Sequence, residues 1–136
     1  MNCDRRPINI FEAISVAITP ALGVLIGVLF ANGLLPGILA GVWIAIAVAA
    51  ISLAAVIIGG AVSSRRSAAC LPCRVGSLVA AAAGVLLAGV AALTLGLTVG
   101  SLLSAAIVGL GAFFFFFLIV RAVNLAICLV YASCGY

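Results

Sequence analysis

The sequence predicts an all-α, polytopic integral membrane protein in which four transmembrane helices form a bundle of two helical hairpins. Residues 13–64 and 75–120 are runs of 52 and 46 residues without one charged side chain, and a helix needs about 20 apolar residues to cross a bilayer. Hydrophobic residues make up 68% of the chain and charged residues 6%. A soluble domain has roughly 45–50% apolar and about 25% charged residues. The 136 residues are therefore expected to form a single membrane domain.

The first uncharged run predicts helices over residues 8–30 and 36–62. The break between them has an identifiable cause, since Asn32 and Gly33 favour a turn and Pro36 suits the first turn of a new helix. Pro20 falls inside the first helix and is expected to kink it, with the hydroxyl of Thr19 or Ser15 available to a freed carbonyl.

A polar connection over residues 63–74 is predicted to be a cytoplasmic loop, followed by helices over residues 75–97 and 102–131. The break between these two helices is the weakest. Gly96, Thr98, Gly100 and Ser101 loosen the helix there, but no proline enforces a turn. If the helix continued through this segment, the chain would have three spans instead of four.

The arginines support four spans and set the orientation. With four spans, five arginines fall on one side of the membrane, and the positive-inside rule makes that side cytoplasmic. These residues are Arg5, Arg6, Arg65, Arg66 and Arg74. Both termini are then expected in the cytoplasm, with the plasma membrane as the location. A cleaved signal is disfavoured because the first apolar segment exceeds the usual core of about 7–15 residues.

The inventory of side chains argues against most enzyme classes. The chain has no His and no Lys, and its only acids are Asp4 and Glu12, so the common general bases and Schiff-base lysines are missing. The net charge of +4 comes from arginines at segment ends. We expect these arginines to orient the chain in the bilayer, with no nucleic acid as partner.

Glycine and alanine are expected to mediate helix packing, because small residues let helix backbones approach closely in lipid. The helix over residues 75–97 has a small residue at every fourth position and is expected to be central. Four residues rotate the helix by about 40° more than one full turn, so this row of small residues winds around the helix. One neighbouring helix can therefore contact only two or three successive residues of the row. Packing within the chain and self-association are both open readings. The glycines singled out are Gly23, Gly27, Gly37, Gly41, Gly76, Gly84, Gly96 and Gly100.

The last helix contrasts with these slender ones, since Phe113 to Phe117 are five consecutive phenylalanines. We expect them to face lipid and to fill gaps beside the small residues, with a hydrophobic gate as the alternative.

Two ionisable residues lie within the predicted spans, where a charge is costly and marks a candidate site. We expect Glu12 and Arg121 to form an ion pair between the first and last helices. The alternatives are that Arg121 extends to the headgroups while Glu12 is hydrated, or that Glu12 is a proton or cation site. Arg121, Asn124, Cys128 and Tyr131 form one stripe on the last helix.

All five cysteines fall on the predicted cytoplasmic side. The pair Cys70 and Cys73 has the spacing of a metal or redox site, and four of the five thiolates would suffice for zinc. The other thiols are Cys3, Cys128 and Cys134. Free thiols, acylated thiols and disulfides are competing readings. No cofactor is expected otherwise, with zinc or an iron–sulfur cluster as the possibilities at this site.

The leading functional hypothesis is a structural or scaffolding protein that self-associates in the lipid bilayer as a homo-oligomer. A small oligomeric pore or transporter is the alternative, with a path lined by scattered hydroxyls that can equally bond to their own helices. These are Ser15, Thr19, Ser52, Thr94, Thr98 and Ser104. A second alternative is a thiol-based redox or metal-binding membrane protein that uses Cys70 and Cys73.

Overall fold

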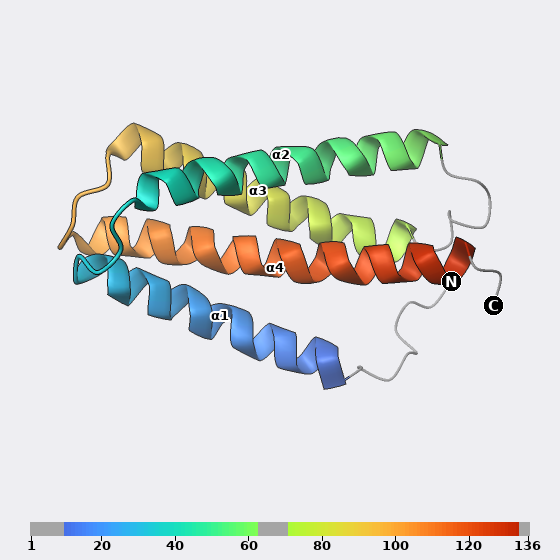
Figure 1. The fold of residues 1–136 in the computed structure, drawn as a ribbon, viewed down its shortest axis with the longest axis horizontal. Coiled ribbons are helices and arrows are strands. Elements are labelled where there is room, and N and C mark those ends of the chain that lie inside the picture. Colours follow the sequence, from blue (N-terminus) through green and yellow to red (C-terminus); the bar gives the residue numbers. More distant parts are fainter. Residues whose placement is uncertain (1–9, 63–70, 134–136) are drawn as a thin grey trace.

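The fold consists of four long helices, seen in a computed structural model that describes residues 10–62 and 71–133. The helices are α1 (Ile10–Ala31), α2 (Ile38–Val62), α3 (Leu71–Leu95) and α4 (Leu102–Ser133). They run roughly side by side along the long axis of the molecule (Figure 1). All four are long and apolar enough to cross a membrane. The all-helical fold and the four long apolar helices that the sequence predicts are therefore present.

The turn between α1 and α2 is built by backbone hydrogen bonds at a glycine. The N–H of Gly33 donates to the carbonyl of Phe30 (2.9 Å), and the N–H of Leu34 donates to that of Leu29 (3.0 Å). Gly33 has a φ of 70°, so the pair of bonds is a Schellman motif. Gly37 also has a positive φ, 81°, and α2 begins one residue later, two residues after its predicted start.

The break between α3 and α4 is a true turn, which settles the choice between three and four helices. Gly96 (φ 68°) follows the last residue of α3, and Gly100 (φ 84°) precedes α4. The N–H of Ser101 donates to the Thr98 carbonyl (3.3 Å), and the N–H of Thr98 donates to Ser104 Oγ (3.2 Å). These bonds hold the start of α4 against the turn.

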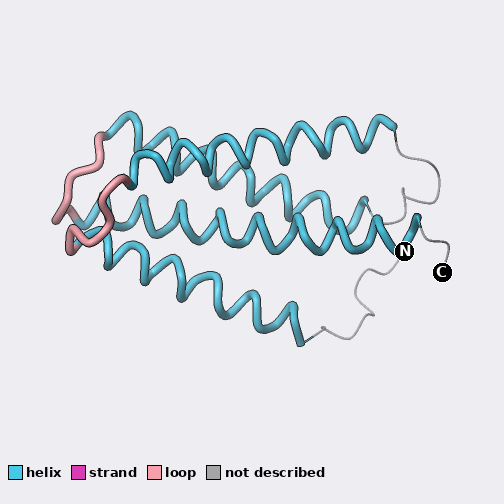
Figure 2. The backbone as a smooth tube through the Cα atoms, viewed as in Figure 1, coloured by secondary structure: helices cyan, strands magenta, loops and turns pink. Residues whose placement is uncertain are grey.

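The predicted loop over residues 63–74 is too long at its C-terminal end, because α3 already begins at Leu71. Pro72 explains the difference, since proline is pre-organised for the first turn of a helix. The starts of α1 and α3 and the ends of α2 and α4 lie at one end of the molecule, and the two glycine turns lie at the other (Figure 2).

The packing differs from two paired hairpins. α3 and α4 pack on each other, but α1 packs chiefly on α4 and α2 chiefly on α3. α4 also touches α2, so α4, rather than the expected helix α3, contacts the most neighbours, although α3 is the most buried span. The reason lies in α4 itself, which has the small residues Ala105 and Gly109 toward α1 and bulky ones toward α3.

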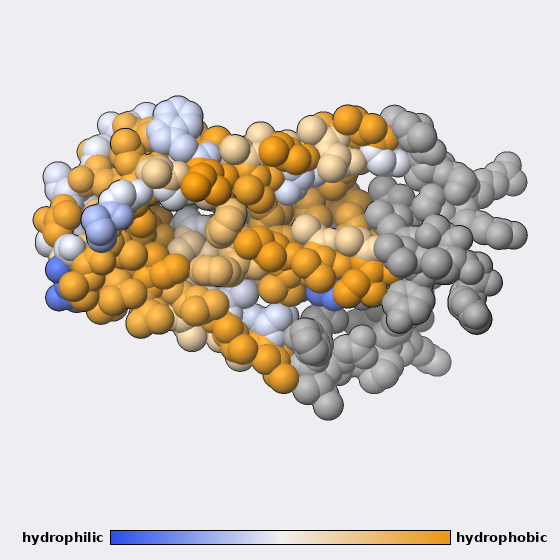
Figure 3. Space-filling model, viewed as in Figure 1, coloured by the Kyte–Doolittle hydropathy of each residue, from blue (hydrophilic) through white to orange (hydrophobic). Residues whose placement is uncertain are grey.

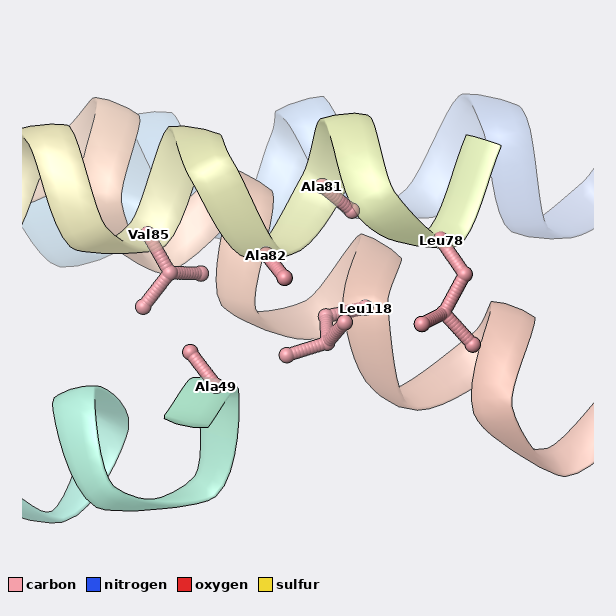
Figure 4. Close-up of a cluster of buried hydrophobic side chains, with 6 residues drawn as sticks. All are labelled: Ala49, Leu78, Ala81, Ala82, Val85 and Leu118. Carbon is pink, nitrogen blue, oxygen red and sulfur yellow. The ribbon is translucent and has the colours of Figure 1, made fainter. Parts of the chain in front are cut away.

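The core lies where α2, α3 and α4 meet (Figure 4). Ala81 and Ala82 of α3 present only methyl groups, which lets Leu118 of α4 and Ala49 of α2 come close. The cluster consists of Ala49, Leu78, Ala81, Ala82, Val85 and Leu118. Beside it, Gly84 makes room for an aromatic ring, since a Cβ at Gly84 would lie 2.5 Å from Phe114 Cγ.

Candidate functional site: an arginine between α1 and α4

The contact between α1 and α4 depends on glycines that remove the side chains from between the two backbones. A Cβ at Gly23 would lie 2.8 Å from the carbonyl oxygen of Gly109, and one at Gly27 would lie 2.9 Å from that of Ala105. Real Cβ atoms essentially never lie this close to another heavy atom, and the opposing atoms cannot move aside because they belong to the backbone. The helices therefore touch directly here, as small-residue pairs allow in membranes.

These contacts fix the antiparallel register of the two helices. Gly27 lies opposite Ala105, and Gly23 lies between Gly109 and Phe113. Each step of four residues toward the start of α1 is matched by a step of four toward the end of α4, because both rows follow the same ridge. Continuing these steps brings the first turn of α1, which contains Glu12, to the level of Arg121.

Arg121 is partly buried, and its charged group lies over an aromatic ring. Its Cζ is 4.7 Å from the centroid of the Phe117 ring, which is within cation–π range. Phe117 precedes Arg121 by one helical turn, in the direction in which helical side chains tilt. The guanidinium is thus held over the preceding turn, away from the C-terminal end of α4, and its Nε atom is buried.

Two hydroxyl residues, Ser15 and Thr19, lie between the first turn of α1 and Gly23. Thr19 is 3% exposed, and its hydroxyl donates to the Ser15 carbonyl (3.0 Å). Pro20 lies inside α1 without interrupting it. Pro20 frees the carbonyl of Val16, whereas the Thr19 hydroxyl bonds to the neighbouring carbonyl of Ser15. The kink at Pro20 stays a prediction.

The backbone fixes the level of Glu12 along the α1–α4 pair and the side of α1 on which it lies. Glu12 lies seven residues before Thr19, which returns it to nearly the same side of the helix, and the register places it level with Arg121. Its side chain lies outside the described residues, so the ion pair stays a prediction.

The polar stripe of α4 is described only in part. Arg121 and Asn124 are half-buried, while the side chains of Cys128 and Tyr131 lie outside the described residues.

The cysteine constellation also lies outside the described side chains. Cys3, Cys70 and Cys134 are in segments that the structure does not describe, and Cys73 and Cys128 are described only as backbone of α3 and α4. Among the described residues, no three potential ligands gather into a metal site. The zinc, iron–sulfur and redox readings therefore stay predictions.

The predicted packing glycines divide into three groups. Gly23, Gly27 and Gly84 lie in close contacts between helices. Gly37, Gly96 and Gly100 are turn residues with positive φ, so conformation rather than packing explains them. The remaining two, Gly41 and Gly76, have no heavy atom within 4 Å of an added Cβ, which leaves them open to approach.

The hydroxyls proposed to line a pore bond locally where the structure describes their bonds. Ser52 donates to Val48 O (2.8 Å) and Thr94 to Val90 O (2.9 Å), each to its own helix. Thr98 and Ser104 pair at the α3–α4 turn, with 3.4 Å between their hydroxyl oxygens. These bonds match the local reading of the hydroxyls, and the pore stays a prediction.

Sequence reasoning did not single out several residues of these contacts. Gly109 lies against Gly23, and Ile46 lies against Gly89 of the expected small-residue helix, since a Cβ at Gly89 would lie 2.7 Å from Ile46 Cγ1. The Phe117–Arg121 contact had a usable signal, because an aromatic residue and a cation four residues apart share a helix face.

Comparison of the chain with protein-family models, with curated proteins and with solved structures finds no match in any of the three.

Proposed function

We propose that the chain is an integral membrane protein of four spans whose role is structural, through association of identical copies. The four apolar helices support the membrane placement. Large hydrophobic side chains also cover their outer faces, as the mainly apolar surface in Figure 3 illustrates. Lipid is the solvent in which such a surface is stable, since apolar patches this extensive are rare on soluble monomers.

The positions of the helix ends support the proposed orientation. The segments that contain Arg5, Arg6, Arg65 and Arg66 adjoin the same end of the bundle, where Arg74 lies in the first turn of α3 (Figure 2). The positive-inside rule assigns this end to the cytoplasm. Both termini then face the cytoplasm, and the glycine turns face the other side of the plasma membrane.

The observation that carries self-association is the division of the small-residue row on α3. One part of the row packs within the chain: Gly84 lies against Phe114, and the Ala88 Cβ is 3.4 Å from a Cβ added at Gly111. The other part, Gly76 and Ala80, is exposed. The two steps from Gly84 back to Gly76 rotate the row by about 80°, so α4 cannot cover all of it.

The exposed part of the row has the form of a helix-docking surface, which we call the outer α3 surface: Gly76, Ala80 and Ala83. All three residues are exposed, and an added Cβ at Gly76 would meet nothing within 4 Å. Lipid tails and leucine are equally apolar, so contact between helices in a bilayer depends on how closely the backbones approach. A second copy gains more contact at this surface than at the neighbouring Leu87, which is 73% exposed.

Energy transfer between donor-labelled and acceptor-labelled copies in liposomes tests this proposal. We expect transfer by the wild type to persist when lipid is increased about tenfold, as mass action requires of a tight complex. G76L/A80L should reduce transfer to the level of random proximity. Gly59 is the control, since it is equally open and lies on α2, and G59L should behave as the wild type. Wild-type transfer that falls on dilution to the level of G76L/A80L would contradict the proposal.

A further inference from the structure

The bundle contains a half-open apolar cavity of about 290 Å³ to which all four helices contribute. Its lining includes Ile26 of α1, Gly41 and Ala45 of α2, Ala88 of α3, and Gly111 and Phe116 of α4. The lining residues have only hydrocarbon side chains.

The cavity exists because small residues face one another across the bundle. Gly41 contributes most directly, since a Cβ added there would meet no heavy atom within 4 Å. On the opposite side, Gly111 and Ala88 have little or no side chain, and a Cβ added at Gly111 would lie 3.4 Å from the Ala88 Cβ. α1 packs on α4 and α2 on α3, so no tight α1–α2 contact closes the remaining side.

We infer that the cavity opens between α1 and α2, because this is the side that the helix packing leaves uncovered. Ile44 of α2 lines the cavity and is also 60% exposed, and Ile26 borders it from α1. In the proposed membrane placement this opening faces the hydrocarbon of the bilayer rather than water.

We propose that the cavity binds the acyl chain of a bilayer phospholipid. This inference rests on the membrane placement proposed above. Water is disfavoured because a buried water needs two to four polar partners, which an apolar lining does not supply. An empty cavity would forfeit van der Waals contact along its whole lining.

The size of the cavity favours an acyl chain over a helix of a second copy of the protein as its occupant. An α-helix with side chains is about 10 Å across and does not enter a space of this volume. The volume is about twice that of an engineered cavity of roughly 150 Å³ that holds benzene, which suits a flexible chain one carbon wide. The headgroup would stay outside, since nothing in the lining can bond to it.

Photocrosslinking in liposomes tests this site. The probe is a phosphatidylcholine with a diazirine at the middle of one acyl chain, and mass spectrometry of peptides locates the adducts. We expect adducts in the wild type on Phe116 and on the segment around Gly41. The series G41A, G41L and G41F should reduce the Phe116 adducts progressively, by about fivefold or more for the two larger side chains as they occupy the space. G59L, an open glycine on the same helix outside the cavity, should leave them unchanged.

Labelling of the outer faces separates failure of this site from failure of the membrane placement. Leu87 and Leu102 are exposed and should be labelled in every variant if the chain spans the bilayer. Strong labelling of both with Phe116 adducts equal in G41L and G59L would overturn the acyl-chain site alone. Absence of labelling at Leu87 and Leu102 would overturn the membrane placement and the site with it. Loss of energy transfer in G41L with unchanged Phe116 adducts would identify a second copy as the occupant and overturn the proposal.

Discussion

Arg121 shows how one charged residue is accommodated among apolar helices. Its guanidinium lies over the Phe117 ring, and the α1–α4 register brings Glu12 to its level. A charge within the hydrocarbon region is costly and is normally stabilised by a partner. The position of the guanidinium over the preceding turn favours a partner within the bundle rather than extension to the headgroups at the end of α4.

Replacing Phe117 tests the contribution of the ring. F117L keeps a similar apolar bulk but removes the π face, and we expect the free energy of unfolding in micelles to fall by about 0.5–2 kcal/mol. Phe116 is the control, because the cation–π contact is made with Phe117. If F116L and F117L lower the unfolding free energy equally, the cation–π contact contributes nothing.

Exchanging the two charges tests the expected ion pair. E12R and R121E should each destabilise the fold, because each places two like charges at one level of the α1–α4 interface. The double variant should recover much of the loss, since it restores opposite charges. Unfolding free energies of the four proteins give the coupling, and a double variant no more stable than the single ones would exclude the pair.

At the scale of elements, glycines fix both the helix pairing and the turns. α1 lies on α4 because Gly23 and Gly27 have no side chains and let the two backbones come into contact. α3 ends where Gly96 takes a positive φ. Helix existence and approximate length could be predicted from sequence, because uncharged length and turn residues act locally. The expected Glu12–Arg121 pair already brings the first and last helices together. The glycine contacts that join α1 to α4 could not be predicted, because glycine-rich faces occur on the first three predicted helices and all of them are compatible with close packing in lipid.

Methyl groups added at the close-contact glycines should separate α1 from α4. We expect G23A and G27A each to lower the free energy of unfolding by about 1–3 kcal/mol, because the opposing atoms are backbone and cannot repack. The matched control G59A adds the same methyl group in open space and should raise stability by about 0.5–1 kcal/mol, since alanine favours helix over glycine. Equal effects at all three positions would show that α1 does not lie on α4.

Alanine at the α3–α4 turn should act through conformation rather than contact. G96A and G100A place a Cβ on residues with φ of 68° and 84°, and we expect each to cost about 1–2 kcal/mol. An added Cβ meets nothing within 4 Å at either position, so steric repulsion by neighbours is not the cause. Unfolding free energies equal to the wild type would indicate that α3 and α4 do not require this turn.

At the scale of the whole molecule, the two described helix connections, α1–α2 and α3–α4, lie at the same end of the bundle (Figure 1). The four long apolar helices and the positions of the arginines in the sequence relative to them follow from the sequence. The central position of α4 and the cavity do not, because both depend on which small residues meet across the bundle. Gly41 carries no sequence signal that distinguishes a cavity wall from a packing surface.

The two ends should differ in their access from outside the cell. Val99 lies in the α3–α4 turn and is 64% exposed. In a variant with its five cysteines replaced by serine, V99C should react with a membrane-impermeant maleimide added to intact cells, whereas S64C should react only after lysis. The reverse pattern of labelling would invert the orientation.

Disulfide crosslinking between copies tests the central claim, that identical copies meet at the outer α3 surface. In the same cysteine-free background, G76C and A80C should form covalent dimers in native membranes under mild oxidation, because close approach of two α3 helices brings these positions within disulfide distance. G59C, which is equally open on α2, should stay monomeric. Dimers formed as readily by G59C, or by none of the three variants, would contradict the account.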